Sequence, residues 1–264
     1  MSNAEPLRIV SLQPSISIVL DCLGKLGLLV GCTRYCLEAL PHLSQRSVAV
    51  VHDSWSTTSD EITALRPDLV IASVPYRQES LAAILKAGHP VLALAPHCLA
   101  DIYQDIRLIG AVSGASEGAE QVVNSMQAEI DRVRNSVEAG SARPVVYCEE
   151  WGKPLIHSQH WVRELVEAAG GEFLGEPGKT TTAEAIEQAD PDVIVLAWCG
   201  ARDRVPVDRV VAKRSWQHLR AVEAGRAVCI PDEWLNTPAP TLLKGLRAFA
   251  DIIHPVKIDM SQNR

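Results

Sequence analysis

The residues best suited to contact a ligand are aromatic side chains and one histidine that stand just after predicted strands. Aromatic residues make up only 5% of the 264-residue chain, yet several fall at such positions. Trp and Tyr supply a large, flat contact area at a low cost in conformational entropy. Each could also cap a hydrophobic core, as we expect of Trp216 within a helical stretch. The predicted ligand-binding residues are Tyr35, Trp55, Tyr76, His97, Trp151, Trp198 and Trp234.

The sequence gives little support for catalysis or for a bound metal. It contains no P-loop lysine motif, no H-E-x-x-H and no G-x-G-x-x-G. Cys32, Cys36 and His42 fit no common zinc spacing, and a fourth ligand is not evident. His157 and His160 could share a helix face, but a solvated or capping role is the simpler interpretation. We therefore expect a non-enzymatic protein with no metal site and no intrinsic cofactor.

The elements that must position the aromatic residues are strands that alternate with helices. This alternation predicts an α/β fold with largely parallel sheets covered by helices on both faces. In such sheets ligands bind beyond the carboxyl ends of the strands, where the aromatic residues stand. The predicted strands are residues 8–12, 28–32, 48–51, 69–72, 91–94, 145–148, 193–197 and 228–230, and the first and last predicted helices are 16–26 and 241–253.

One pattern occurs twice in the chain. An acid, a short helical stretch, Pro-Asp and an apolar run occupy residues 61–72 and again residues 184–197. A second pair follows in the same order, residues 86–94 and 223–231. The repeat predicts two similar α/β lobes with a ligand-binding cleft between them.

A long amphipathic helix is predicted between the two lobes. Apolar residues spaced three or four apart run through a Gln/Glu/Arg-rich segment from about residue 113 to 139. A helix of this length spans more than about 30 Å, which suits a rigid strut better than a crossover between strands. The predicted domains are an N-terminal lobe (5–113), a bridging helix (114–140) and a C-terminal lobe (141–256).

Composition limits the partners and the compartment. The net charge of −7 and the absence of a basic stripe argue against nucleic acid binding, and the apolar runs are too short for membrane insertion. The first residues have neither a basic start nor an apolar run typical of an export signal, and seven cysteines are an odd number. We expect a cytoplasmic protein, or a periplasmic one if Ser2-Asn3-Ala4 is the remnant of a tag that replaced a signal.

Glu61 and Glu184 occupy equivalent places in the repeat, near the N-termini of two predicted helices. A carboxylate there interacts favourably with the helix dipole, and capping is sufficient to explain both residues. One carboxylate on each lobe could also meet basic residues of a two-subunit partner. Both interpretations stay open on the sequence.

Several segments resemble the substrate-binding proteins of vitamin B12 and iron-siderophore ABC importers. The resemblance runs from residue 8 to about 255 and implies the class III periplasmic-binding-protein-like fold, in which two α/β lobes are joined by one long helix. Each motif is loose, but their order and spacing together are specific. The matching segments are 8–15, 26–27, 29–33, 65–72, 109–110, 168–171 and 191–194.

Among these proteins the cobalamin-binding members are the most similar. Their corrin ligand is contacted by aromatic residues at places that Tyr35, Trp55 and Trp151 match. They dock on an ABC transporter permease through one glutamate per lobe, which Glu61 and Glu184 match. The resemblance implies a monomer that binds cobalamin or another corrinoid without chemistry; a cytoplasmic relative would bind it without feeding a permease.

Other ligands remain open. Siderophore binders present arginines to anionic iron chelates, and Arg34 and Arg77 allow that interpretation. Haem binders supply a Tyr or His ligand to iron, and Tyr76 or His97 would allow haem. From other classes, the fold could serve an enzyme that handles a tetrapyrrole or a metal, or a regulatory module.

Overall fold

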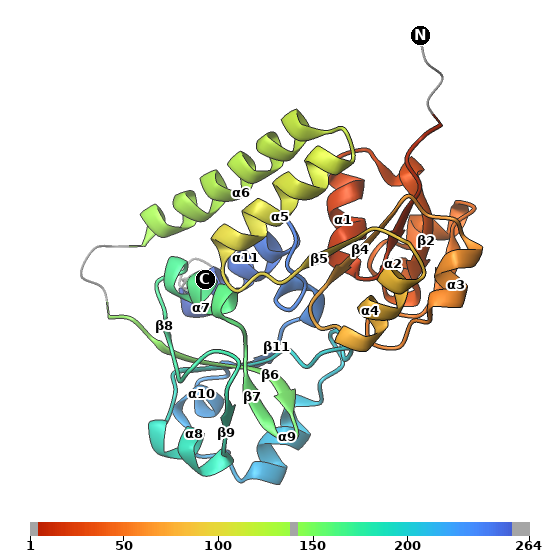
Figure 1. Cartoon of the computed structure of the whole chain (residues 1–264). Coiled ribbons are helices and arrows are strands. Elements are labelled where there is room, and N and C mark those ends of the chain that lie inside the picture. The colour runs from red at the N-terminus through yellow and green to blue at the C-terminus, as the bar shows by residue number, and fades with distance from the viewer. Residues whose placement is uncertain (1–4, 138–141, 255–264) are drawn as a thin grey trace. The chain divides into compact units, whose positions relative to one another are not determined.

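The chain folds into two α/β units (Figure 1). The computed structural model describes residues 5–137 and 142–254. Residues up to Ser125, together with Pro238–Pro240, belong to unit 1, and the remainder from Met126 onward belongs to unit 2. The α/β class with parallel-rich sheets is confirmed.

Unit 1 is built on a five-stranded sheet in which every pair of neighbours is parallel. The strand order is β3-β2-β1-β4-β5. The strands read as almost continuous apolar runs because helices cover both faces of a parallel sheet. Their bounds are β1 Ile9–Ser11, β2 Leu29–Thr33, β3 Ala49–Val51, β4 Leu69–Ser73 and β5 Val91–Leu94.

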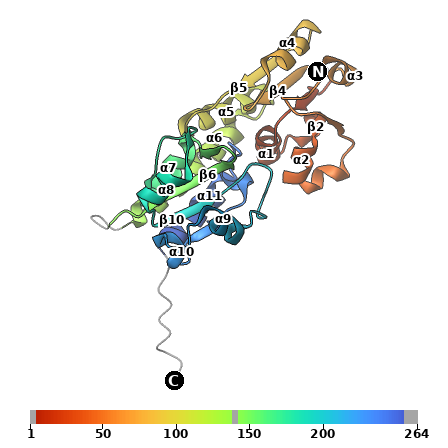
Figure 2. The same ribbon diagram turned by 90° about the horizontal axis from the view of Figure 1, so that it is seen from below.

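Helices flank this sheet, as Figure 2 shows from below. Most of them begin shortly after a strand ends, so the strand-to-helix loops gather at the carboxyl edge of the sheet. The helices are α1 Pro14–Cys22, α2 Arg34–Ala39, α3 Ser59–Ala64, α4 Gln78–Lys86 and α5 Leu99–Val112, with short 3-10 turns η1 Leu26–Leu28 and η2 Pro41–Gln45. The core of unit 1 includes Val10, Leu12, Ile62, Val70 and Ile84.

Unit 2 has a mixed six-stranded sheet, ordered β11-β10-β6-β7-β9 with β8 beside β6. β7 is antiparallel to both of its neighbours, whereas the other pairs are parallel. The sequence predicted β6, β10 and β11 but missed the antiparallel strands β7 and β9 and the short parallel strand β8. The bounds are β6 Val145–Gly152, β7 Leu155–His157, β8 Glu172–Phe173, β9 Thr180–Thr181, β10 Val193–Leu196 and β11 Ala227–Cys229.

The helices of unit 2 enclose a core around two aromatic rings. Tyr147 and Trp216 are fully buried, and their rings meet edge to face with centroids 6.1 Å apart. The structural role predicted for Trp216 is therefore confirmed. The helices are α7 His160–Ala168, α8 Ala183–Ala189, α9 Val207–Arg214, α10 Arg220–Glu223 and α11 Leu242–Ile253, with the 3-10 turn η3 Asp232–Trp234.

The sequence repeat corresponds to a repeated structural motif. Its first half forms α3 and β4 in unit 1 and α8 and β10 in unit 2. Its second half forms the turn into β5 and the turn into β11, where Gly88 and Gly225 have positive φ angles of 89° and 67°. Glycine takes this left-handed conformation without steric cost. The repeat therefore marks equivalent positions in the two sheets.

The long predicted helix is present as α6, Ser116–Ser136. Its apolar positions Val123, Met126, Ile130 and Val133 are buried, as the three-to-four spacing predicts. The predicted bridging segment 114–140 extends further, but residues 138–141 lie outside the described part of the chain. The boundary between the units falls within α6, after Ser125.

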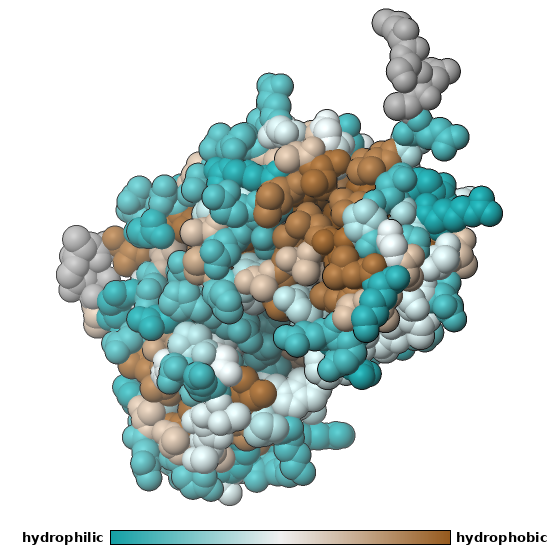
Figure 3. All heavy atoms as spheres, viewed as in Figure 1, coloured by the Kyte–Doolittle hydropathy of each residue, from teal (hydrophilic) through white to brown (hydrophobic). Residues whose placement is uncertain are grey.

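Some apolar surface remains exposed in unit 1. Figure 3 shows hydrophobic side chains gathered over α5, whose Leu108 and Val112 are 47% and 39% exposed. Among the described residues, none of the helices combines the length and apolar character needed to cross a membrane.

Candidate functional site

The larger candidate site is a pocket of about 760 Å³ in unit 2. It lies beside the carboxyl ends of β6 and β10, where an α/β sheet is expected to bind ligands. Its lining is mainly apolar and aromatic, with a few charged groups, as is common for small-molecule sites. The lining residues are Trp151, Gly152, Lys153, Leu155, Ala183, Glu184, Trp198, Cys199, Gly200, Ala201, Val210, Lys213, Arg214 and Ser215.

Two of the predicted tryptophans line this pocket together. Trp151 stands near the end of β6, is 45% exposed, and donates its indole N–H to the carbonyl of Lys153 (2.9 Å). Trp198 follows β10 and is half-buried. Its Nε1 donates to Oε1 of Glu149 (2.7 Å). Both hydrogen bonds satisfy the polar end of the ring and leave its faces available for packing.

Beneath the pocket lies an ion pair that the sequence did not predict. Glu149 is 0% exposed, and Arg214 contacts both of its oxygens, at 2.7 and 2.9 Å. The Tyr147 hydroxyl donates to Oε2 of the same carboxylate. Burial, together with the Glu149 charge, raises the pKa of Tyr147, so this phenol stays protonated and serves as a donor. The signal available in the sequence was an acid that directly follows the apolar run 145–148 within a predicted strand region.

Cys199 lines the pocket and contacts a second acid, Glu150. Burial raises the pKa of Glu150, although Gln159 donates to its Oε2 at 2.6 Å. The Cys199 thiol is directed at Oε1 of Glu150 (3.7 Å), and Asn236 donates to Cys199 Sγ (3.4 Å). Burial and the nearby Glu150 raise the pKa of Cys199. The sulfur is therefore held as a thiol, which is a poor metal ligand and a poor nucleophile.

Unit 1 has a smaller pocket of about 340 Å³ at the ends of β2 and β3. The predicted ligand-binding residue Tyr35 lines it. The Arg34 guanidinium lies over the Tyr35 ring, 4.6 Å from its centroid, and donates to the phenol oxygen (2.7 Å). The lining residues are Thr33, Arg34, Tyr35, Val50, Val51, His52, Asp53 and Ser56.

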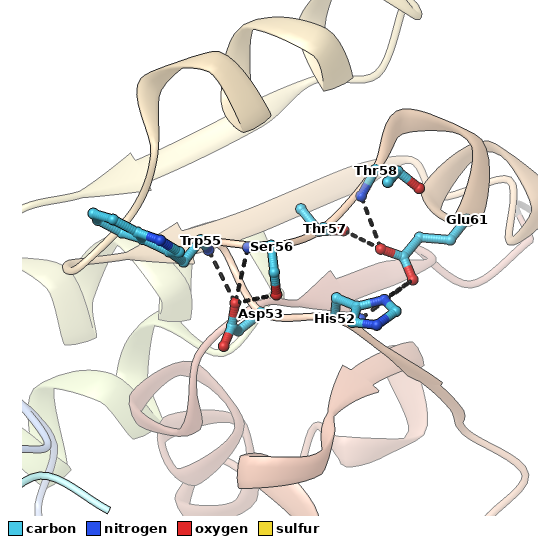
Figure 4. A network of polar contacts seen from close by, with 7 residues as sticks. All are labelled: His52, Asp53, Trp55, Ser56, Thr57, Thr58 and Glu61. Carbon is cyan, nitrogen blue, oxygen red and sulfur yellow. Dashed lines mark hydrogen bonds and ion pairs between the residues drawn. The ribbon is translucent and has the colours of Figure 1, made fainter.

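Trp55 stands on the loop between β3 and α3, and its side chain is 56% exposed (Figure 4). Asp53 Oδ1 accepts hydrogen bonds from the backbone amides of Trp55 (3.1 Å) and Ser56 (3.0 Å), which fixes the turn. Trp55 itself is not among the residues that line the smaller pocket. The loop therefore presents a large indole to its surroundings on a rigid backbone.

Three other predicted residues lie outside both pockets. Tyr76 packs against the core of unit 1. The His97 amide donates to Asp101 at the start of α5 (2.9 Å). Trp234 is in η3, with the Lys244 ammonium 5.9 Å from its ring centroid. The structure thus brings Trp151 and Trp198 together but places these three elsewhere.

The two repeat glutamates have different environments. Glu61 belongs to a capping box: its Oε1 accepts from the Thr58 amide (2.8 Å) and the Thr57 hydroxyl (2.7 Å), and its Oε2 lies 3.0 Å from His52 Nδ1 (Figure 4). Burial acts to raise its pKa, but these hydrogen bonds prevail and lower it. Glu184 is exposed in the first turn of α8 and lines the larger pocket.

The described residues contain no group of three or more His, Cys, Asp or Glu arranged to hold a metal ion. Cys32 and Cys36 are both fully buried, and the Thr33 hydroxyl lies 3.2 Å from Cys36 Sγ. The segment 114–118 does spell G-x-S-x-G, but Ser116 begins α6 directly after α5. A nucleophilic serine of that motif stands on a strand-to-helix turn, so this match is not a catalytic site.

Comparison with known proteins identifies one family. A family model described as "Periplasmic binding protein" matches residues 9–234. The chain is 26% identical over 265 residues to the cobalamin-binding protein of Halobacterium salinarum, a match that covers 97% of this chain and 72% of the relative.

Solved structures share the fold. A periplasmic heme-binding protein from Pseudomonas aeruginosa superposes with a TM-score of 0.84 at 22% identity, covering 95% of this chain and 94% of that one. The periplasmic vitamin B12-binding protein BtuF of Vibrio cholerae gives 0.74 at 21% identity, covering 93% and 96%. At these identities the superpositions establish the architecture.

Proposed function

Because the chain belongs to the periplasmic binding protein family, we propose that it binds a corrinoid, with cobalamin as the ligand, and releases it chemically unchanged. Such proteins bind a small substrate and deliver it to an ABC transporter permease. The observation that carries the corrinoid proposal is the pairing of Trp151 and Trp198 in one mainly apolar pocket. The relative in Halobacterium salinarum is named for cobalamin, which supports the same choice.

The contacts of the arginines favour a neutral ligand over an anionic iron chelate. Arg214 lines the larger pocket, but Glu149 already engages two of its nitrogens. Arg34 lies on the Tyr35 ring, and Arg77 pairs with Glu79 at 3.8 Å outside both pockets. Of the other charged residues that line the larger pocket, Lys153 and Lys213 are cations and Glu184 is an anion. A siderophore site needs uncompensated cations, whereas a corrin needs flat apolar surface and groups that hydrogen-bond its amides.

The direct test is titration of the purified chain with cyanocobalamin, hemin and a ferric siderophore in parallel. We expect the absorption band of cyanocobalamin to shift and the melting temperature to rise with its concentration. A ligand that binds only the folded chain stabilises it by about 2.7 kcal/mol at one hundred times its Kd. Binding of hemin or the siderophore without any response to cyanocobalamin would refute the corrinoid assignment.

Location and delivery are further parts of the proposal. The family acts with ABC transporters, so the cytoplasmic location expected from composition is tested by fractionation of the source cells. If the protein works with a permease, Glu184 is the better placed of the two repeat glutamates to meet it, because Glu61 is occupied by its capping contacts. Co-purification with a permease, and its loss in Glu184→Lys, would support this role.

A further inference from the structure

The carboxylate of Glu149 is held by donors from three directions in unit 2. Arg214 contacts both oxygens, Tyr147 donates to Oε2, and Trp198 Nε1 donates to Oε1. An ionised carboxylate offers about four acceptor sites, so these four contacts use its full capacity. The group is completely buried. Its position is therefore fixed by the surrounding side chains and not by solvent.

Stability alone is a poor explanation of this buried pair. Removing two charges from water costs free energy that their mutual attraction often fails to recover, and apolar replacements of similar volume are frequently neutral. Buried ionic groups can instead specify one conformation of their neighbours. Among the partners of Glu149, Trp198 presents its ring to the pocket.

The indole of Trp198 also packs closely on Gly152. A Cβ placed on Gly152 would lie 2.5 Å from Cζ2 and 2.7 Å from Cε2 of that ring. Real Cβ atoms do not approach so closely, so the ring packs directly on the glycine backbone. With its N–H held by Glu149 and its edge held by Gly152, the indole has one orientation in the pocket.

Arg214 connects this arrangement to the core. Its guanidinium lies over the ring of Trp216, 4.8 Å from the centroid, and Trp216 is fully buried. Arg214 is itself only 11% exposed. The chain of contacts from Trp216 through Arg214 and Glu149 to Trp198 thus starts in a buried core and ends at the pocket surface.

We propose that Glu149 and Arg214 are positioning residues, which fix the Trp198 indole in the orientation that packs against the ligand. The inference rests on the proposed function, because it takes the larger pocket as the place where a corrinoid binds. Arg214 then contributes through Trp198 and not as a cation that attracts an anionic group. In the larger pocket, recognition of the ligand then depends on the oriented face of the Trp198 ring.

The first test replaces the polar network by apolar groups of similar size. The variant Tyr147→Phe, Glu149→Met, Arg214→Met is expected to melt near the wild-type temperature and to bind cyanocobalamin at least about tenfold more weakly, a loss of about 1.4 kcal/mol. In a Trp198→Phe background, the same three substitutions should change Kd by less than about twofold, because the group that they position is gone. Equal losses in both backgrounds, or an unchanged Kd, would overturn the proposal.

A second variant acts on the Trp198 ring through Gly152 and leaves the ion pair intact. Gly152→Ala should displace the indole and weaken cyanocobalamin binding, with Gly27→Ala as a control because its Cβ would meet nothing within 4 Å. A wild-type Kd in Gly152→Ala would count against an oriented ring.

A third measurement needs no ligand. The indole N–H signal of Trp198, assigned by its absence in Trp198→Phe, should exchange slowly with water in the wild type and quickly in the triple variant. If wild-type protein fails to bind cyanocobalamin, the proposed function fails, and this exchange rate still decides the positioning role. Equal exchange in both proteins would refute it.

Discussion

At the scale of single residues, the indole rings of Trp151 and Trp198 are the main candidates for ligand contact. Trp198→Ala should weaken cyanocobalamin binding by about 10- to 100-fold, the loss expected when a central aromatic anchor is truncated. Isothermal titration calorimetry measures this change in Kd. Trp151→Phe keeps a ring and should lose less than Trp151→Ala, and equal affinities for wild type and both alanine variants would contradict the site.

Glu61 is expected to stabilise the folded state of unit 1. Glu61→Ala removes a capping box and should lower the free energy of unfolding by about 1 kcal/mol. Glu184→Ala is the matched comparison at the equivalent place in α8, where the side chain is exposed and should contribute less than that of Glu61. Because the pKa of Glu61 is lowered from its ordinary 4.5, its stabilising charge is present above that pH and is lost as the pH falls below it.

Denaturation of wild type and Glu61→Ala at neutral pH and near pH 3 tests both statements. The difference between the two proteins should shrink in acid. A constant difference would show that the carboxylate charge is not what stabilises the cap.

The strand-end rule predicts Trp151 and Trp198 as ligand contacts, and both line the larger pocket, because both follow strands that the apolar pattern predicts well. Their contact with a ligand stays a prediction. The rule could not find the Glu149–Arg214 pair, whose members lie 65 residues apart. It also predicts Tyr76 as a ligand contact, which stays a prediction; the Tyr76 side chain packs against the core of unit 1, since a residue after a strand can equally turn inward. The local sequence pattern predicts where a strand ends along the chain, but the direction of the side chain at that point depends on tertiary packing.

At the scale of elements, the close approach of α5 and α6 depends on Gly110. A Cβ on Gly110 would lie 2.4 Å from Cβ of Ala119 and 3.2 Å from the Ala115 carbonyl oxygen. Gly110→Ala should therefore destabilise the chain by about 1–3 kcal/mol through overpacking. Chemical denaturation measures the change.

Gly118, on α6, provides a control of opposite sign. Its Cβ would make an ordinary 3.4 Å contact with Leu23, so Gly118→Ala should be neutral or stabilise by up to about 1 kcal/mol through helix propensity. Similar effects of the two substitutions would refute the steric explanation. The Ile109-Gly110 motif, noted first as a resemblance, thus has a packing reason.

Asp105, on α5, makes the stability of the folded chain depend on pH. Burial and the neighbouring Asp101 raise its pKa to about 6 from 3.8. The folded state then favours the protonated acid, so its ionisation removes stability as the pH rises from 3.8 through 6. Asp105→Asn should raise the melting temperature at pH 7.5 and leave it unchanged near pH 3.5, as thermal denaturation would reveal. A variant less stable than wild type at pH 7.5 would contradict this account.

The predicted elements were most accurate where apolar runs are longest. The antiparallel edge of unit 2 was missed because β7 has three residues and β9 only two, Thr180 and Thr181, and neither forms an apolar run. β7 pairs with β6 and β9 pairs with β7, so each strand is defined by its neighbour in the sheet and not by its own composition.

At the scale of the whole molecule, the net charge of −7 means that salt should affect the binding of an anionic ligand more than that of a neutral one. Cyanocobalamin is neutral, so its Kd should change less than about twofold between low salt and roughly 0.5 M NaCl. An anionic chelate held by lysines would bind more weakly as the salt screens those charges. A strong salt dependence for cyanocobalamin would mean that charges, and not ring faces, dominate its recognition.

The sequence predicted the fold class and family because these follow from order and spacing along the whole chain. The internal repeat and the motifs from residue 8 onward use many weak signals that agree with one another. The identity of the ligand depends on a few side chains and their contacts, so the same information cannot fix it. The domain limits 5–113, 114–140 and 141–256 stay predictions.

The uneven distribution of tryptophan has an optical consequence. Trp55 is the sole tryptophan of unit 1, whereas the others lie in unit 2. A Trp55→Phe variant therefore emits ultraviolet fluorescence from unit 2 alone. A corrinoid absorbs in the range of that emission and would quench it by energy transfer, so the protein carries an internal reporter of pocket occupancy that needs no attached dye.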